Sequence, residues 1–166
     1  MDYLGRMRIA NQYEKLGVIS ESLVAVKLGK HWGVISKYEK LIIQPYYDSF
    51  TPFKNGRSIV KQKGKYGLAS KDGRFPIPIE YDKLEETPYG NWRCYQKGKI
   101  GVLSDLGQGG IYPKYDFLQD LGNGFVISRK DGFYGLDAFS GFNIIFHKYD
   151  NIKYNSHDNT YFVISN

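Results

Sequence analysis

Only a few residues in this chain have the type and spacing that catalysis requires. Glu85 and Glu86 form an acidic pair that could serve glycoside hydrolysis if the two carboxyl groups faced one another at about 5 to 9 Å. We favour the alternative, in which both side chains belong to a solvated loop. Residues 107–110 have the glycines of a phosphate-binding loop but lack its lysine and its following helix, so they indicate a flexible turn between strands.

The histidines and the cysteine do not have the spacing of a metal site. His31, His147 and His157 are widely separated, and the chain has neither a His-x-x-x-His nor a Cys-x-x-Cys motif. Cys94 is the only cysteine, which excludes an internal disulfide, and we expect it to be a small buried residue rather than a nucleophile. We therefore expect no enzymatic activity, no bound metal and no cofactor.

The elements that would position any site follow from a repeat of 34 residues. Two residue types recur at this step without insertion: glycine at Gly33, Gly67, Gly101 and Gly135, and tyrosine at Tyr13, Tyr47, Tyr81, Tyr115 and Tyr149. Repeat proteins bury a continuous core by stacking such units on their neighbours. We expect a single repeat domain over residues 1–166, with units of approximately 1–34, 35–68, 69–102, 103–136 and 137–166.

Each unit contains the pattern of three short strands. The span from residue 57 to residue 77 is typical: a β-rich segment at Arg57–Lys61 precedes a glycine turn, then Tyr66–Ala69 follows, and a brief third segment centres on Ile77. The sequence thus predicts an all-β fold of three-stranded antiparallel meanders. We favour an open twisted array of these meanders, and a closed propeller-like ring of about five blades is the alternative.

The repeated glycine predicts close packing, because a side chain at that position would collide with a neighbouring backbone or ring. We favour the ring of the repeated tyrosine as the group that covers the glycine. An acidic residue follows each of these tyrosines, as Asp82 follows Tyr81. We expect its carboxylate to accept hydrogen bonds from main-chain amides at the junction between units.

These motifs resemble the WG repeat family of bacterial proteins, in which a Trp-Gly pair opens a strand and an Ile-Pro-x-x-Tyr-Asp stretch closes the unit. Trp32 and Gly33 supply the pair, and Ile77–Asp82 supplies the closing stretch. The chain departs from the pattern because only one copy keeps tryptophan, and His147 stands where proline is expected. The resemblance implies a non-enzymatic binding or scaffolding role with no common catalytic residues.

The formal charge of +6 is concentrated at one type of turn. Nine of the 23 lysine and arginine residues flank the first turn of the repeat: Lys27, Lys30, Lys61, Lys63, Lys65, Lys97, Lys99, Arg129 and Lys130. Stacked repeats would align them as a basic stripe for nucleic acid or for an acidic ligand. We favour the alternative that lysines at these turns keep strand edges soluble.

We expect the chain to recognise another protein, with nucleic-acid binding and glycan binding through exposed aromatic residues as the other candidates. The residues that differ most between copies would form the specificity surface, and these include Trp92, Arg93, Tyr95 and Asp137. Met1–Ser20 has no apolar run typical of a signal peptide, and no segment resembles a membrane span. A cytoplasmic location is therefore expected, whereas the sequence assigns neither a partner nor an oligomeric state.

Overall fold

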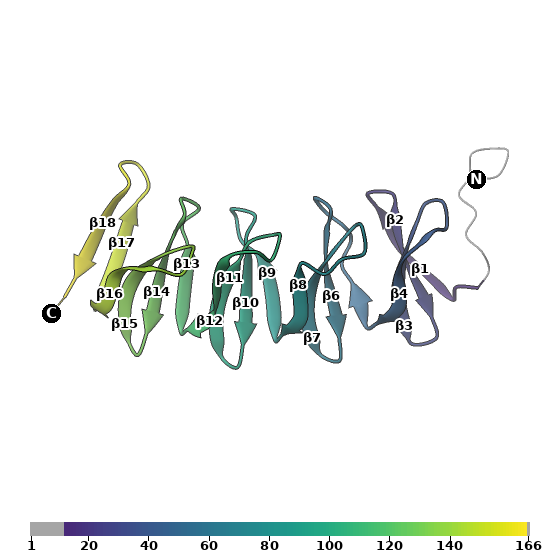
Figure 1. Cartoon of the computed structure of the whole chain (residues 1–166), viewed down its shortest axis with the longest axis horizontal. Helices are drawn as coiled ribbons and strands as arrows, with labels where there is room; N and C mark the ends of the chain where they lie inside the picture. Colours follow the sequence, from purple (N-terminus) through teal and green to yellow (C-terminus); the bar gives the residue numbers. More distant parts are fainter. Residues whose placement is uncertain (1–11, 166) are drawn as a thin grey trace. The chain divides into compact units, whose positions relative to one another are not determined.

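The computed structural model describes residues 12–165 and contains only β-strands in that range (Figure 1). Residues 1–11 and residue 166 lie outside the described part. The expectation that Met1–Ser20 is not a signal peptide therefore concerns a segment that is mostly outside the described residues. The chain divides into two compact units between Tyr81 and Asp82. In the described residues there is no helix long and apolar enough to cross a membrane.

The first unit contains two four-stranded antiparallel sheets. Sheet A has the order β1-β2-β3-β4, and sheet B has the order β5-β6-β7-β8. The strands of sheet A are β1 (Lys15–Ser20), β2 (Leu23–Leu28), β3 (His31–Ser36) and β4 (Leu41–Tyr47). Those of sheet B are β5 (Ser49–Phe50), β6 (Arg57–Gln62), β7 (Lys65–Ser70) and β8 (Ile77–Tyr81).

The second unit repeats this architecture twice and adds a hairpin. Sheet C is formed by β9 (Lys83–Glu86), β10 (Trp92–Gln96), β11 (Lys99–Leu103) and β12 (Gly110–Tyr115). Sheet D is formed by β13 (Phe117–Asp120), β14 (Phe125–Lys130), β15 (Phe133–Ala138) and β16 (Asn143–Tyr149). The hairpin, sheet E, consists of β17 (Asn151–Asn155) and β18 (Thr160–Ile164).

The predicted all-β fold of antiparallel repeats is confirmed, but each complete sheet has four strands rather than three. The additional strand is the segment after the repeated tyrosine, which pairs with the first predicted strand of the next repeat. The backbone amide of Asp82, for example, donates to the carbonyl of Tyr95 at 2.8 Å. This strand varies in length, from two residues in β5 to six in β1, and in the shorter copies its sequence carries little strand pattern.

The repeated glycine lies against the backbone of the last strand in its sheet. A Cβ on Gly33 would lie 2.6 Å from the carbonyl oxygen of Ile43, and one on Gly101 would lie 2.3 Å from that of Ile111. The prediction that a tyrosine ring covers these glycines is wrong. The tyrosine instead pairs across strands with the residue before the glycine, as Tyr47 pairs with Trp32, because the last strand bulges opposite the glycine.

The acidic residue after the tyrosine accepts hydrogen bonds from main-chain amides in three repeats, as expected, but these amides belong to a hairpin turn rather than to the junction between units. The carboxylates of Glu14, Asp82 and Asp116 accept hydrogen bonds from the amides of Gly29, Lys97 and Asp131, at 3.2, 2.7 and 3.3 Å. These amides lie at the hairpin turn of the following repeat. Each carboxylate therefore ties the start of one sheet to that turn.

Apolar side chains fill the space between adjacent sheets within each unit. Val34 of sheet A and Val60 of sheet B belong to one buried cluster, and Val102 of sheet C and Val126 of sheet D belong to another. The residue after Val34, Ile35, is also fully buried, because the opposite face of sheet A has its own apolar cluster. Strand β3 is thus covered on both faces, which leaves functional roles to the sheet edges and to the gaps between sheets.

Candidate functional site

The nine residues of the predicted basic stripe all lie in or beside the hairpin turns between the two central strands of sheets A to D. Two-residue turns with positive φ occur here, as at Lys63 (49°) and Gly64 (77°). Several of the basic groups are engaged within the fold. The ammonium of Lys61 lies 5.2 Å from the ring centroid of Tyr66, and that of Lys99 lies 2.5 Å from Asp116. Five of the nine residues lie at turns of the first unit, and the other four lie at turns of the second unit. Binding of a ligand by these residues stays a prediction.

The predicted specificity residues separate in the structure. Trp92 is only 7% exposed and lies in the core, so it does not contribute to a surface. Arg93 and Tyr95 are half-buried on the other face of β10. The Tyr95 hydroxyl donates to Glu85 at 2.8 Å, and Lys83 forms an ion pair with the same carboxylate at 2.6 Å. Tyr95 is therefore engaged within sheet C.

Glu85 and Glu86 do not lie in a loop, because both belong to β9. Successive side chains of a strand point to opposite faces, so the two carboxylates do not face one another across a substrate-sized gap. The hydrogen bonds from Lys83 and Tyr95 lower the pKa of Glu85. This carboxyl group is thus held in its charged form, which is the opposite of what a general acid requires.

Cys94 is fully buried, as expected from its repeat position. His31 and His157 are exposed. No group of three or more histidine, cysteine, aspartate or glutamate residues with metal-binding geometry occurs within residues 12–165.

A buried polar cluster forms in sheet D around Asp137, which is fully buried. Its carboxylate accepts hydrogen bonds from Tyr115 at 2.9 Å, from Asn143 at 3.0 Å and from Ser128. The repeat pattern contains the signal for this cluster, because Asp137 and Ser128 occupy positions where sheet A has the buried Ile35 and Val26. Sequence reasoning identified Asp137 and the unusual His147 separately but did not bring them together.

His147 completes this cluster but does not form a nucleophilic triad with it. The Ser128 hydroxyl donates its proton to Asp137, so it accepts from the Nε2 of His147, 2.7 Å away. A histidine that donates to the serine cannot act as its general base. Burial lowers the pKa of His147, whereas the Asp137 carboxylate acts in the opposite direction. Burial also raises the pKa of Tyr115, and its hydrogen bond to Asp137 acts in the same direction.

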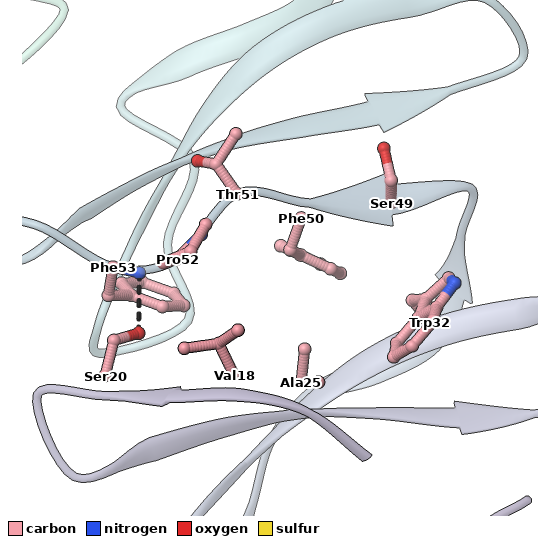
Figure 2. A pocket seen from close by; sticks show the side chains of 10 residues that line it. Val18, Ser20, Ala25, Trp32, Ser49, Phe50, Thr51, Pro52 and Phe53 are labelled. Carbon is pink, nitrogen blue, oxygen red and sulfur yellow. Dashed lines mark hydrogen bonds between the residues drawn. The ribbon is translucent and has the colours of Figure 1, made fainter. Parts of the chain in front are cut away.

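A pocket of about 200 Å³ opens in the first unit between sheet A and the start of sheet B. Figure 2 shows the rings of Trp32 and Phe53 at opposite ends of it, with Phe50 between them on the sheet B side. The amide of Phe53 donates to the Ser20 hydroxyl at 2.7 Å, which ties the loop after β5 to the end of β1. The walls of the pocket are mainly apolar.

Two small residues of sheet A create this space. Gly17 and Ala25 line the pocket, and they occupy the positions of Thr51 and Ile59 in sheet B and of Glu85 and Arg93 in sheet C. A Cβ added to Gly17 would lie 3.0 Å from that of Ala25 and 3.6 Å from the Trp32 ring. The pocket therefore depends on residues particular to the repeat that keeps tryptophan.

Sequence reasoning did not predict this pocket. Trp32 was identified for its repeat motif, but nothing in the pattern of a single repeat shows that residues 49–53 lie opposite it. The available signal was the pair of small residues at Gly17 and Ala25. It becomes informative only when the four-stranded register is known, because β1 is the additional strand.

Comparison with family models gives a match over one part of the chain. Residues 32–66 match the family model described as "WG containing repeat", so the predicted resemblance is confirmed over this span. No curated protein matches the chain in sequence.

Two solved structures show a weak similarity of fold. Kluyveromyces lactis Hsv2p is 10% identical, with a TM-score of 0.40, over 93% of this chain and 57% of that one. A form of KlHsv2 with loop 6CD replaced by a Gly-Ser linker is 10% identical, with a TM-score of 0.36, over 91% of this chain and 60% of that one. The chain thus spans less than two thirds of the length of either structure.

Proposed function

We propose that this WG repeat protein is a non-enzymatic binding module, and that the pocket beside Trp32 receives an apolar side chain of a partner protein. The observation that carries the proposal is the hollow that Gly17 and Ala25 create against an aromatic wall. Aromatic residues that can be desolvated by a partner contribute strongly to protein recognition. Trp32 is half-buried and so retains surface for such a contact.

The size of the pocket favours a side chain over a cofactor. Small-molecule sites commonly enclose about 300 to 1,000 Å³, whereas a cavity of about 150 Å³ accommodates a benzene-sized group. At about 200 Å³, the pocket matches one aromatic or aliphatic side chain. Apolar walls with a few hydroxyl groups at Ser20, Ser49 and Thr51 suit this type of anchor.

The basic turns favour nucleic acid or another acidic ligand as the second candidate. The carboxylates of Glu14, Asp82 and Asp116 lie at the same turns and reduce their net charge. Engagement of Lys61 and Arg129 with tyrosine rings also gives these residues a structural role. These contacts make protein recognition the better supported proposal.

The proposal can be tested by selecting ligands from a display library of random twelve-residue peptides. We expect enriched peptides to share one apolar residue and to lose binding in the Trp32→Ala variant. Tyr66→Ala is the matched control, because Tyr66 holds the equivalent position in sheet B but does not line the pocket. Ala25→Ile provides a second test, since it fills the pocket without removing an aromatic residue.

Thermal unfolding of each variant shows whether it is folded before its binding is compared. Selected peptides that bind the wild type and Ala25→Ile with equal affinity would contradict the proposal, as would a library that yields no binders.

A further inference from the structure

Lys15 and Lys27 form an unusual pair at the border of the pocket. They are direct cross-strand partners on β1 and β2, and Lys27 is also the cross-strand partner of Trp32 on β3. Cross-strand partners lie on the same face of a sheet, with Cβ atoms about 4.5 to 5.5 Å apart. The two lysines and the indole therefore form one row across sheet A.

This row is adjacent to the residues that line the pocket. Lys15 precedes Gly17 by two positions on β1, and Lys27 follows Ala25 by two positions on β2. Residues two apart on a strand share a face, and although the register of β1 shifts between Leu16 and Ile19, a Cβ on Gly17 would still lie 3.0 Å from that of Ala25. Both ammonium groups thus extend from the face of sheet A that forms the pocket wall.

Like charges at directly opposed positions destabilise a sheet. The equivalent pairs in the other sheets avoid this arrangement: Ser49 with Lys61, Lys83 with Tyr95, and Phe117 with Arg129. Among residues 12–165, no acidic side chain forms an ion pair with Lys15 or Lys27. Only the repeat with the Trp32 pocket therefore carries two opposed cations without a counterion in the described part of the chain.

The charge of the two units reinforces this local feature. The unit that ends at Tyr81 has 14 lysine and arginine residues against 7 aspartate and glutamate residues, a formal charge of +7. The unit that begins at Asp82 has 9 against 10, a formal charge of −1. All of the net positive charge that would attract an acidic partner therefore lies in the unit with the pocket.

We infer that Lys15 and Lys27 bind a carboxylate next to the apolar anchor, so the ligand of the Trp32 pocket is an acidic peptide segment with an aliphatic or aromatic residue among aspartates or glutamates. This inference rests on the proposed function of the pocket. The apolar residue enters between sheets A and B while the adjacent carboxylate neutralises the opposed ammonium groups. Binding thereby relieves a repulsion that the free protein retains.

The inference can be tested by isothermal titration calorimetry with three capped eight-residue peptides. Each has a central leucine, and the flanking residues are aspartate, serine or lysine. At about 50 mM salt we expect the aspartate peptide to bind at least tenfold more tightly than the serine peptide, and the lysine peptide to bind most weakly. Raising the salt to about 300 mM should reduce the difference, because exposed charges are then screened.

The lysine variants identify which charges are responsible. Lys15→Ser reproduces the pair found in sheet B, and we expect it to remove most of the preference for aspartate while binding of the serine peptide persists. Lys40→Ser is the control, because Lys40 is exposed, lies outside the predicted basic stripe and does not line the pocket. Lys15→Ser should also unfold at the same temperature as the wild type or at a higher one. If Lys15 served only to stabilise the fold, its replacement would lower the unfolding temperature.

The outcomes separate this inference from the proposed function. Equal affinity for all three peptides, each abolished by Ala25→Ile, would overturn the acidic preference and leave the pocket proposal standing. If none of the peptides bound, both would be contradicted. Binding of an eight-nucleotide oligothymidine that requires Lys15 and Lys27 but is unaffected by Ala25→Ile would replace the acidic peptide by nucleic acid.

Discussion

The carbonyl oxygen of Ile77 lies so close to Gly67 that a Cβ on the glycine would be only 2.8 Å from it. The equivalent carbonyls approach Gly33, Gly101 and Gly135 in the other complete sheets. The glycine that defines the repeat therefore makes room for a bulged strand, and its absence of a side chain is a packing requirement rather than a conformational one.

We expect Gly67→Val to destabilise the protein by about 3 kcal/mol, because the backbone of β8 must move to admit the side chain. Gly64→Ala is the control: this glycine has a φ of 77° but no atom within 4 Å of an added Cβ, so backbone strain alone should cost about 1 kcal/mol. Urea unfolding measures both values. Equal losses in the two variants would contradict the packing explanation.

The buried cluster of sheet D gives a second prediction. Asp137→Leu introduces the residue found at the same position in sheet C, Leu103, but it removes the acceptor of Ser128 and Tyr115. We expect a loss of about 3 kcal/mol, since buried donors left without partners are costly. Adding Ser128→Val should then cost less than the same substitution in the wild type, because the hydrogen bond from Ser128 to Asp137 is already lost. Strictly additive losses in urea unfolding would contradict this coupling.

The pH dependence of stability should reveal His147. Its pKa is lowered in the folded protein, so the unfolded chain takes up a proton first as the pH falls. The stability that neutral His147 contributes is present above its ordinary pKa of about 6.5 and is lost as the pH falls below that value. The carboxylates with lowered pKa values, Asp72, Glu85, Asp116 and Asp158, titrate in a more acidic range.

We therefore expect the melting temperature to fall more steeply between pH 7.5 and pH 5 in the wild type than in His147→Gln. His157→Gln serves as the control, because His157 is exposed and outside the cluster. If His147→Gln and the wild type lost the same number of degrees over this range, the assignment to His147 would be wrong.

The repeat made much of the fold predictable from sequence. The spacing of Gly33, Gly67 and their equivalents fixes the register of the copies, and turn residues such as Lys63 and Gly64 identify the hairpins. The strand after each tyrosine was missed because its pairing is non-local and its length is as short as Ser49–Phe50. Gly67 could be recognised as a packing position, but the bulge that covers it is set by the strand register.

The candidate site was less predictable because it lies between repeats. Trp32 and Phe53 come from different sheets, and only their packing encloses the pocket. Trp92 looked distinctive in sequence, yet strand alternation places it in the core. Comparison of equivalent positions becomes useful once the sheets are known, since it then singles out Gly17 and Ala25 as the residues that create the space.

The fluorescence of Trp32 tests the central claim most directly. The wild-type protein is titrated with the aspartate-flanked leucine peptide, and Trp32→Phe is titrated as the reference, since Trp92 is then the one remaining tryptophan. Burial of the indole by the leucine should shift the wild-type emission to shorter wavelength, with a midpoint equal to the calorimetric Kd, and should leave the reference unchanged. Saturating peptide that leaves the wild-type emission unaltered, or that shifts both proteins equally, would contradict binding in the Trp32 pocket.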